Sequence, residues 1–309
     1  MIGYLKDKAG STTALPALLQ WRILLTDGDP CDAFSLCVLY EPELLPILRE
    51  ACGFYAMEGA RRVFTGVVDD YEISMTKKGL LAEITGRGMA AKLLDTQVRA
   101  AEYQSAQLSD ILGAYVTRCG VEVAECDTMP PVRQFVIETG YTCWQVLSGF
   151  CRHSAGIFPR FSADGRLILQ KKGRDGSLTI RNCAESVWFS DDRYATVATE
   201  ILVNTRNGSQ QEASNAAFIA RGGGRVQVVG TTGSKVRAIW RTAEQRIEDA
   251  ARNTRQLSVR IPGSFLASPT ETVTVQLDAL GLSGQFVVRS AESVCDENGA
   301  TCLLTMRER

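Results

Sequence analysis

Apolar and polar residues alternate along residues 61–76 and again along residues 79–84, with Lys77-Lys78-Gly79 between the two runs. Alternation with a period of two is typical of strands with one buried face, so these residues predict a long β-hairpin. Gly66 lies inside the first run, where it predicts a bulge or a close backbone approach. After Gly86-Arg87-Gly88, apolar residues take up helical spacing over residues 89–94. A bent hairpin that leads into a short helix is therefore expected.

Upstream of this hairpin the pattern predicts further strands. Residues 20–25 and 33–40 alternate on either side of the turn sequence Asp27-Gly28-Asp29-Pro30 and should form a hairpin. Residues 43–53 are compatible with a short helix or a bulged strand. Residues 1–15 are rich in small and polar side chains and are expected to form a loose arm. About five strands are enough to close a small barrel, so we predict a first β-barrel domain over residues 1–98.

The character of the chain changes near residue 98. Apolar residues recur at helical spacing over residues 105–119, and Gly120 follows as a predicted C-cap. Thr142 and Gln145 form a capping box that should open a second helix, with Trp144, Leu147 and Cys151 on its buried face. Short strands at 121–123 and 133–137 and a hairpin over 158–171 complete a predicted α+β module over residues 99–177.

Strand signals return in the last part of the chain. Strands are expected at 178–182, 186–189 and 199–205, and the Gly-, Ser-, Asn- and Gln-rich residues that follow predict a long exposed loop at about 206–235. A second capping box, Thr242 and Gln245, predicts a helix that can cover one opening of a barrel. Four strands between residues 257 and 306 complete a second small antiparallel barrel over residues 178–309. The predicted fold class is mainly β, with two small antiparallel β-barrel domains and a helix-containing middle module.

The amino-acid composition is that of an ordinary globular protein, and the net charge limits the classes of partner that the protein can be expected to bind. The 309 residues are 45% hydrophobic and carry a formal charge of −1, which argues against nucleic acid or an anionic membrane as the main partner. The N-terminal residues lack the order of regions of a signal peptide, and no segment approaches the roughly 20 apolar residues of a spanning helix. We therefore expect the protein to stay in the cytosol where it is made, unless it is exported by a non-classical route.

The ten cysteines include no Cys-x-x-Cys pair, and with the single His153 they form no zinc-type set. We expect most of them to be reduced, apolar core residues, and we expect His153 to be a capping or surface residue. If Asn298-Gly299 forms a two-residue turn, Cys295 and Cys302 fall opposite each other on paired strands. We therefore predict that these two thiols are close and reduced.

Two stretches resemble a known family. The sequence F-x-G-x-V, a long hairpin, I-T-G-R-G and then L-L-D, at residues 64–95, resembles the baseplate hub proteins of contractile tails, the late-control-D and Mu-type tail hub group. The C-terminal third resembles the same group in the same order. It has a helix rich in Ala and Arg at 250–255, a V-x-I-P-G strand at 259–263, a G-x-F-x-V strand at 284–288 and a D-x-N-G turn at 296–299.

The resemblance implies a structural protein with two tube-type barrels per chain. Three chains would then present six barrels in a pseudo-sixfold ring, with a tail tube on one side and a threefold spike on the other. It implies a homotrimer in a phage tail or related injection device, assembled in the bacterial cytoplasm, with DNA only as cargo in its channel. No enzymatic activity, catalytic residue, metal or cofactor is expected, because the chain is short and no hydrolase domain is recognisable.

Two other functions remain open on the residues alone. A cell-wall or carbohydrate-active enzyme would need converging carboxylates, for which Asp69, Asp70 and Glu72 are candidates, although solvent-facing charge explains them better. A nucleic-acid-binding module could use residues 221–260, which hold nine Lys or Arg and three acids, but only Trp240 is aromatic there. In a hub, basic residues of this stretch would instead dock on acidic tube subunits. The predicted docking residues are Arg221, Arg225, Lys235, Arg237 and Arg241.

Overall fold

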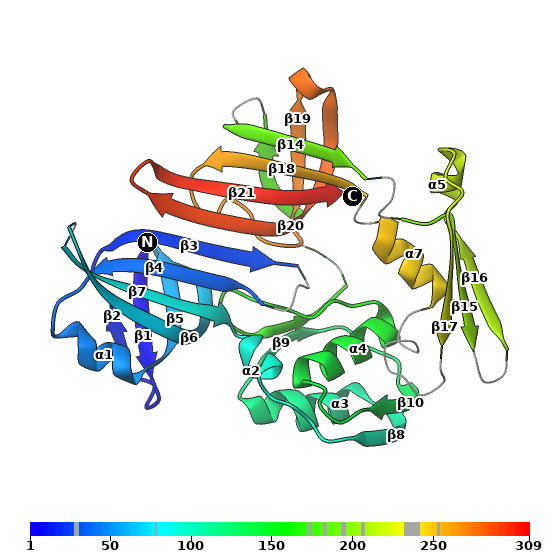
Figure 1. Ribbon diagram of the computed structural model, residues 1–309, viewed down its shortest axis with the longest axis horizontal. Helices are drawn as coiled ribbons and strands as arrows, with labels where there is room; N and C mark the ends of the chain where they lie inside the picture. The colour runs from blue at the N-terminus through cyan, green and yellow to red at the C-terminus, as the bar shows by residue number, and fades with distance from the viewer. Residues whose placement is uncertain are drawn as a thin grey trace.

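The computed structural model describes residues 1–27, 31–77, 79–171, 173, 175–181, 184–192, 196–204, 208–231, 242–251 and 254–309. The protein is mainly β, as predicted, and its buried side chains gather in three cores. We call the surrounding elements the first β unit (β1 to β7), the middle unit (α2 to β12) and the last β unit (β13 to β21). Figure 1 shows the first β unit at the left, the last β unit at the top and the middle unit at the lower centre, with a small sheet projecting at the right. The predicted domain boundaries near residues 98 and 177 stay predictions.

The first β unit is an antiparallel sheet in the order β3-β4-β7-β6-β5-β1-β2. Its strands are β1 (Ile2–Asp7), β2 (Thr12–Ala14), β3 (Leu18–Thr26), β4 (Ala33–Leu39), β5 (Ala51–Glu58), β6 (Arg61–Thr76) and β7 (Gly79–Gly88). The sheet bends around a core that includes Phe34, Phe54 and Phe64, whose ring centroids are 4.4 to 6.0 Å apart. The predicted hairpins β3–β4 and β6–β7 are both confirmed; Gly28, Asp29 and Pro30 of the first turn lie outside the described residues.

Glycine permits the close approach predicted in the long hairpin. A Cβ atom on Gly66 would lie 2.2 Å from the carbonyl oxygen of Arg87, and one on Gly86 would lie 2.1 Å from that of Val67. A register shift follows between Val68 and Asp70. Any side chain at these two glycines would force the strands apart, so the bend of β6 over β7 depends on both.

The N-terminal arm was predicted wrongly. Residues 1–15 are not loose, because β1 and β2 form a hairpin and β1 pairs with β5. Leu5 is fully buried in the first core, although charged residues follow it directly in the sequence. Residues 43–53, for which helix and strand were both open, form helix α1 (Leu44–Glu50) followed by the start of β5. Tertiary burial of a few apolar side chains decided both cases.

The middle unit packs helices against short strands. Its elements are α2 (Ala91–Leu94), β8 (Ala101–Ala106), α3 (Leu108–Ile111), a π turn at Leu112–Val116, a 3₁₀ turn at Thr117–Cys119, β9 (Val123–Cys126), β10 (Val132–Ile137), α4 (Cys143–Ala155), β11 (Arg160–Phe161) and β12 (Leu167–Leu169). The predicted helix begins three residues late because Ser105 and Ala106 pair with β10, and it ends as predicted at Gly120 with φ 68°. The capping box of Thr142 and Gln145 is present, which confirms the start of α4.

The last β unit contains most of the expected strands. These are β13 (Asp175–Ile180), β14 (Ser186–Asp191), β15 (Thr199–Asn204), β16 (Gln210–Ser214), β17 (Val226–Thr231), β18 (Arg255–Pro262), β19 (Thr272–Leu277), β20 (Leu282–Asp296) and β21 (Gly299–Glu308). The helices are α5 (Ala216–Ala220), a 3₁₀ turn at Asp278–Leu280 and α7 (Ala243–Ala251). Strands β13, β19, β20, β21, β18 and β14 pair in that order around the third core.

The predicted long loop at 206–235 is also corrected. Within its described part, β16, α5 and β17 are ordered elements, and β16 and β17 flank β15 in a three-stranded sheet. The predicted helix α7 exists, but it contacts β15 and β16 of this small sheet. Its Arg246 guanidinium pairs with the buried carboxylate of Glu200 on β15, and Ile247 is buried beside it. The helix therefore covers the small sheet and not the opening of a barrel.

The two β units share one continuous sheet. Strand β20 pairs with β19 along its first half, and its second half pairs with β3, so that Cys295 lies opposite Trp21. Phe265, from the connection between β18 and β19, enters the first core and stacks on Trp21 with centroids 5.3 Å apart. The first and last β units are therefore joined by both backbone pairing and a shared aromatic contact.

The predicted register of the final hairpin is wrong. Cys302 lies opposite Ser293, and Cys295 lies opposite Ala300. The reason is local, because the Asp296 carboxylate accepts a hydrogen bond from the Asn298 backbone N–H at 2.7 Å and Gly299 has φ 109°. The turn is therefore centred on Glu297 and Asn298, one residue earlier than predicted. Both cysteines are free thiols, as expected.

Candidate interaction surfaces and the cavity between the units

Two of the five predicted docking residues lie in the described part of the chain. Arg221 follows α5, and its guanidinium donates to Asp191 at the end of β14 at 2.5 Å. Arg225 precedes β17 and is exposed. Lys235, Arg237 and Arg241 fall outside the described residues. The structure therefore brings Arg221 to an internal ion pair and leaves the docking role of all five a prediction.

Asp191 is a local centre of charge pairing. It accepts from Arg221 and, at 3.4 Å, from Arg255, whose other nitrogen donates to Glu308 at 2.7 Å. Although partial burial acts to raise it, the pKa of Asp191 is held below its usual value by the two guanidinium groups. These contacts tie the end of β14 to α5, β18 and β21, so part of the basic excess is neutralised within the chain.

Strand β14 presents apolar side chains at the border of the large sheet. Among the described strands it pairs only with β18, and its Trp188 and Phe189 are 54% and 41% exposed. An edge strand offers unpaired backbone groups, and large exposed aromatic residues beside them are typical of a contact surface. The sequence predicts the strand but not its edge position, because the order in which strands pair cannot be derived from the pattern of a single strand.

The small sheet has one covered and one uncovered face. Glu200 and Leu202 face α7 and are buried, whereas Ile201 lies on the opposite face next to Val228. Val226 lies on that same face, opposite Thr199. Val226 and Val228 are 56% and 62% exposed. The alternation of Val226 and Val228 in the sequence was a signal for this strand. These residues were nevertheless included in the predicted loop, because Gly, Ser, Asn and Gln dominate the sequence before them.

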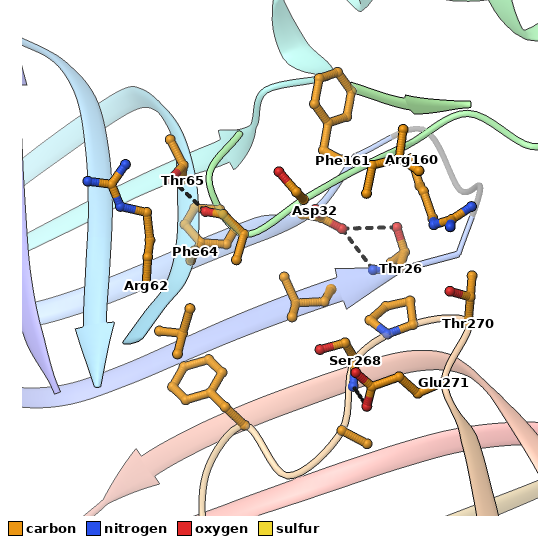
Figure 2. Close-up of a pocket in the computed structure, with 18 of the residues that line it drawn as sticks. Thr26, Asp32, Arg62, Phe64, Thr65, Arg160, Phe161, Ser268, Thr270 and Glu271 are labelled. Carbon is orange, nitrogen blue, oxygen red and sulfur yellow. Dashed lines mark hydrogen bonds between the residues drawn. The ribbon is translucent and has the colours of Figure 1, made fainter. Parts of the chain in front are cut away.

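A cavity of about 300 Å³ lies where the three units meet. Figure 2 shows the side chains around it, which include residues of β3, β6 and β11, of the segment before β4 and of the connection before β19. Thr65 donates a hydrogen bond to the carbonyl oxygen of Ala163 at 2.7 Å, joining the first and middle units. Arg61 donates to the carbonyl oxygen of Phe265 at 3.2 Å, joining the first and last β units.

The two carboxylates at the cavity are both engaged with backbone. Glu271 accepts from the Ser268 N–H at 3.0 Å, and Asp32 accepts from the N–H and hydroxyl of Thr26 at 2.8 and 3.2 Å. Burial raises the pKa of Asp32 to about 6, and the two hydrogen bonds from Thr26 offset only part of this effect. Figure 2 shows both dashed bonds to Thr26. These hydrogen bonds hold the segment before β4 and the connection before β19 in place, and we assign no chemical reaction to the two carboxylates.

The acids considered for catalysis do not converge. The Asp69 carboxylate binds the Arg87 guanidinium through two hydrogen bonds of 2.6 and 2.8 Å, and Arg87 also binds Asp95 at 2.8 and 3.0 Å. Asp70 is exposed on β6, as is Glu72. Arg87 therefore links the long hairpin to the residue that follows α2, and the pKa of Asp95 is lowered chiefly by its hydrogen bond to Arg87.

No group of three or more His, Cys, Asp or Glu side chains in the described part of the chain is placed to hold a metal ion. Among the described helices, none combines the length and the apolar character needed to cross a membrane.

Comparison with known proteins gives the fold. No protein-family model and no curated protein sequence matches the chain. Among solved structures, the tail protein of Neisseria meningitidis MC58 superposes with a TM-score of 0.81 at 17% identity, covering 99% of this chain and 96% of that one. The 43 kDa tail protein of prophage MuSo2 from Shewanella oneidensis gives 0.80 at 15% identity, covering 99% and 98%. The chain has the fold of phage tail proteins.

The tail-protein fold also occurs outside phages. An Escherichia coli component of the type VI secretion system, described as similar to the T4 bacteriophage tail proteins gp27 and gp5, has a TM-score of 0.59 at 13% identity, covering 94% of this chain and 73% of that one. These neighbours agree with the resemblance to baseplate hubs found in the sequence. At such low identity the likeness establishes the fold alone.

Proposed function

We propose that this protein is the structural baseplate hub of a contractile phage tail or a related injection device. Three copies form a pseudo-sixfold ring that joins the tail tube to the central spike, in a virion tail assembled in the bacterial host cytoplasm. The observation that carries this proposal is the whole-chain match to two phage tail proteins, each covered over more than nine-tenths of its own length.

The presence of two β units in one chain supports the ring. The first and last β units each wrap their own core, and β3 and β20 hold them side by side. If both units act as tube-type barrels, three chains present six of them, which would match a sixfold tube on one side and a threefold spike on the other. A trimer of one chain could then match both the sixfold tube and the threefold spike.

The uncovered apolar residues support a partner at the end of the last β unit. Trp188 and Phe189 on β14 are large and exposed, and their strand has one neighbour among the described strands. Contact between copies would remove them from water. The predicted docking residues Arg221, Arg225, Lys235, Arg237 and Arg241 would then face the tail tube, where charge complementarity sets the register.

The mass of the purified protein in solution tests the ring. Light scattering should give about 101 kDa, three times the 33.7 kDa chain. A Trp188→Glu variant should dissociate to monomers, whereas Leu280→Glu, at a residue 51% exposed on a 3₁₀ turn, should leave the mass unchanged. A protein that stays monomeric both alone and with its spike would refute the proposal.

Attachment to the tube is tested separately. Charge reversal at Arg237 and Arg241 should weaken binding to tube subunits while the trimer mass is unchanged. Undiminished tube binding by the double variant would exclude these residues as docking groups.

A further inference from the structure

Two cysteines of the middle unit lie in van der Waals contact. The Sγ atoms of Cys119 and Cys143 are 3.9 Å apart, although 24 residues separate them in the chain. Cys119 is the last residue of the 3₁₀ turn after the α3 helix, and Cys143 is the first residue of α4. The contact therefore connects the end of one helix to the beginning of another.

The two thiols differ in access. Cys143 is buried in the core of the middle unit, whereas Cys119 is half-buried. Cys119 also lies at a helix end, next to Gly120, whose left-handed backbone terminates the turn. A small-molecule oxidant can therefore reach Cys119 first, and the bonding distance of about 2.0 Å requires the sulfur atoms to approach by about 2 Å.

The surroundings set the rate of any reaction. Burial, followed by the neighbouring Cys119, raises the pKa of Cys143 to about 11, and the adjacent Arg118 opposes this shift. The Cys143 thiolate is scarce at neutral pH as a result. Attack by Cys143 should therefore be slow near pH 7 and faster in mildly alkaline solution.

We propose that Cys119 and Cys143 form a disulfide when the protein meets a low-molecular-weight disulfide such as oxidised glutathione. Cys119 attacks the oxidant, forms a mixed disulfide and releases one reduced glutathione. Cys143 then attacks the Cys119 sulfur, forms the intramolecular bond and releases the second. Two protein thiols are oxidised and one oxidant disulfide is reduced. The bond fastens the helix over residues 108–119 to α4, and this inference does not depend on the hub function.

The consequence is a middle unit whose stiffness depends on the redox state of its surroundings. In a reducing cytoplasm both thiols persist, and outside it the cross-link closes. Because the bond constrains the unfolded chain between the two helices, the oxidised protein should unfold at a temperature several degrees higher than the reduced protein.

The test uses the full chain incubated with oxidised or reduced glutathione at about pH 8.5. Intact mass should fall by two hydrogen atoms in the oxidised sample, and non-reducing peptide mapping should join the peptides that hold Cys119 and Cys143. Dithiothreitol should reverse both the mass change and the rise in unfolding temperature.

Three variants control the experiment. Cys119→Ser, at the half-buried position, should fold and lose the cross-link, and Cys143→Ser should lose it as well. Cys302→Ser should keep it, because Cys302 lies in the last β unit. A persistent glutathione adduct on Cys119, a link between other cysteines, or no change in mass would overturn the proposal.

Discussion

Replacing Asp32 with asparagine should stabilise the protein at neutral pH. Asp32 lies at the cavity between the units, where burial raises its pKa from 3.8 to about 6. When folding raises the pKa of a carboxyl group, ionisation of that group is less favourable in the native state than in the unfolded state, and it lowers the stability of the native state. Its ionisation therefore costs stability progressively as the pH rises from about 4 to about 6. An asparagine side chain carries no charge and keeps an oxygen that can accept from Thr26.

The expected gain in the free energy of unfolding follows from the size of the Asp32 pKa shift. A difference of about two pKa units at about 1.4 kcal/mol each gives about 3 kcal/mol as an upper limit above pH 6. The amide oxygen of the Asp32→Asn variant can still accept from the Thr26 N–H and hydroxyl, so little of this gain should be lost. Below about pH 4 Asp32 is protonated in both states, and wild type and variant should differ little.

Urea unfolding followed by fluorescence at several pH values between 4 and 8 measures this difference. The gap between Asp32→Asn and wild type should open between pH 4 and pH 6 and stay constant above. Asp95→Asn is a matched control of opposite sign, because Arg87 lowers the pKa of Asp95 and neutralising it should reduce stability at pH 7. A variant that is less stable than wild type at pH 7.5, or a gap that does not vary with pH, would refute the reasoning.

Three further substitutions test the packing. Gly86→Ala should destabilise the protein by about 3 to 5 kcal/mol, because its Cβ would lie 2.1 Å from the Val67 carbonyl oxygen. The control in the same urea assay is Gly113→Ala, whose Cβ would meet no described atom within 4 Å. Phe265→Ala should cost about 3 to 5 kcal/mol by opening the first core beneath Trp21, and an unchanged urea midpoint would contradict that packing. Arg246→Met should cost about 3 to 5 kcal/mol by leaving the Glu200 carboxylate buried without its cation, and the loss should be restored in part by Glu200→Gln in the same background.

Local sequence patterns predicted most of the helices and strands, but they did not predict which elements pair or pack with one another. The alternation in β6 and β7, the capping box of Thr142 and the C-cap at Gly120 were all found from the sequence, because each depends on residues within one or two turns. The sequence identified the charge of the candidate docking residues, but it did not show that Arg221 pairs with Asp191. That contact joins residues 30 positions apart.

The sequence by itself determined a mainly β chain, its long bent hairpin and its resemblance to tail hubs. Only the tertiary structure decided that β1 joins β5, that β20 pairs with β3, and that Cys302 faces Ser293. It alone placed Trp188 on a sheet edge and Cys119 against Cys143. The physical reason is that periodicity fixes which face of an element is buried, whereas the neighbour that covers the face is selected by packing between residues far apart in the chain.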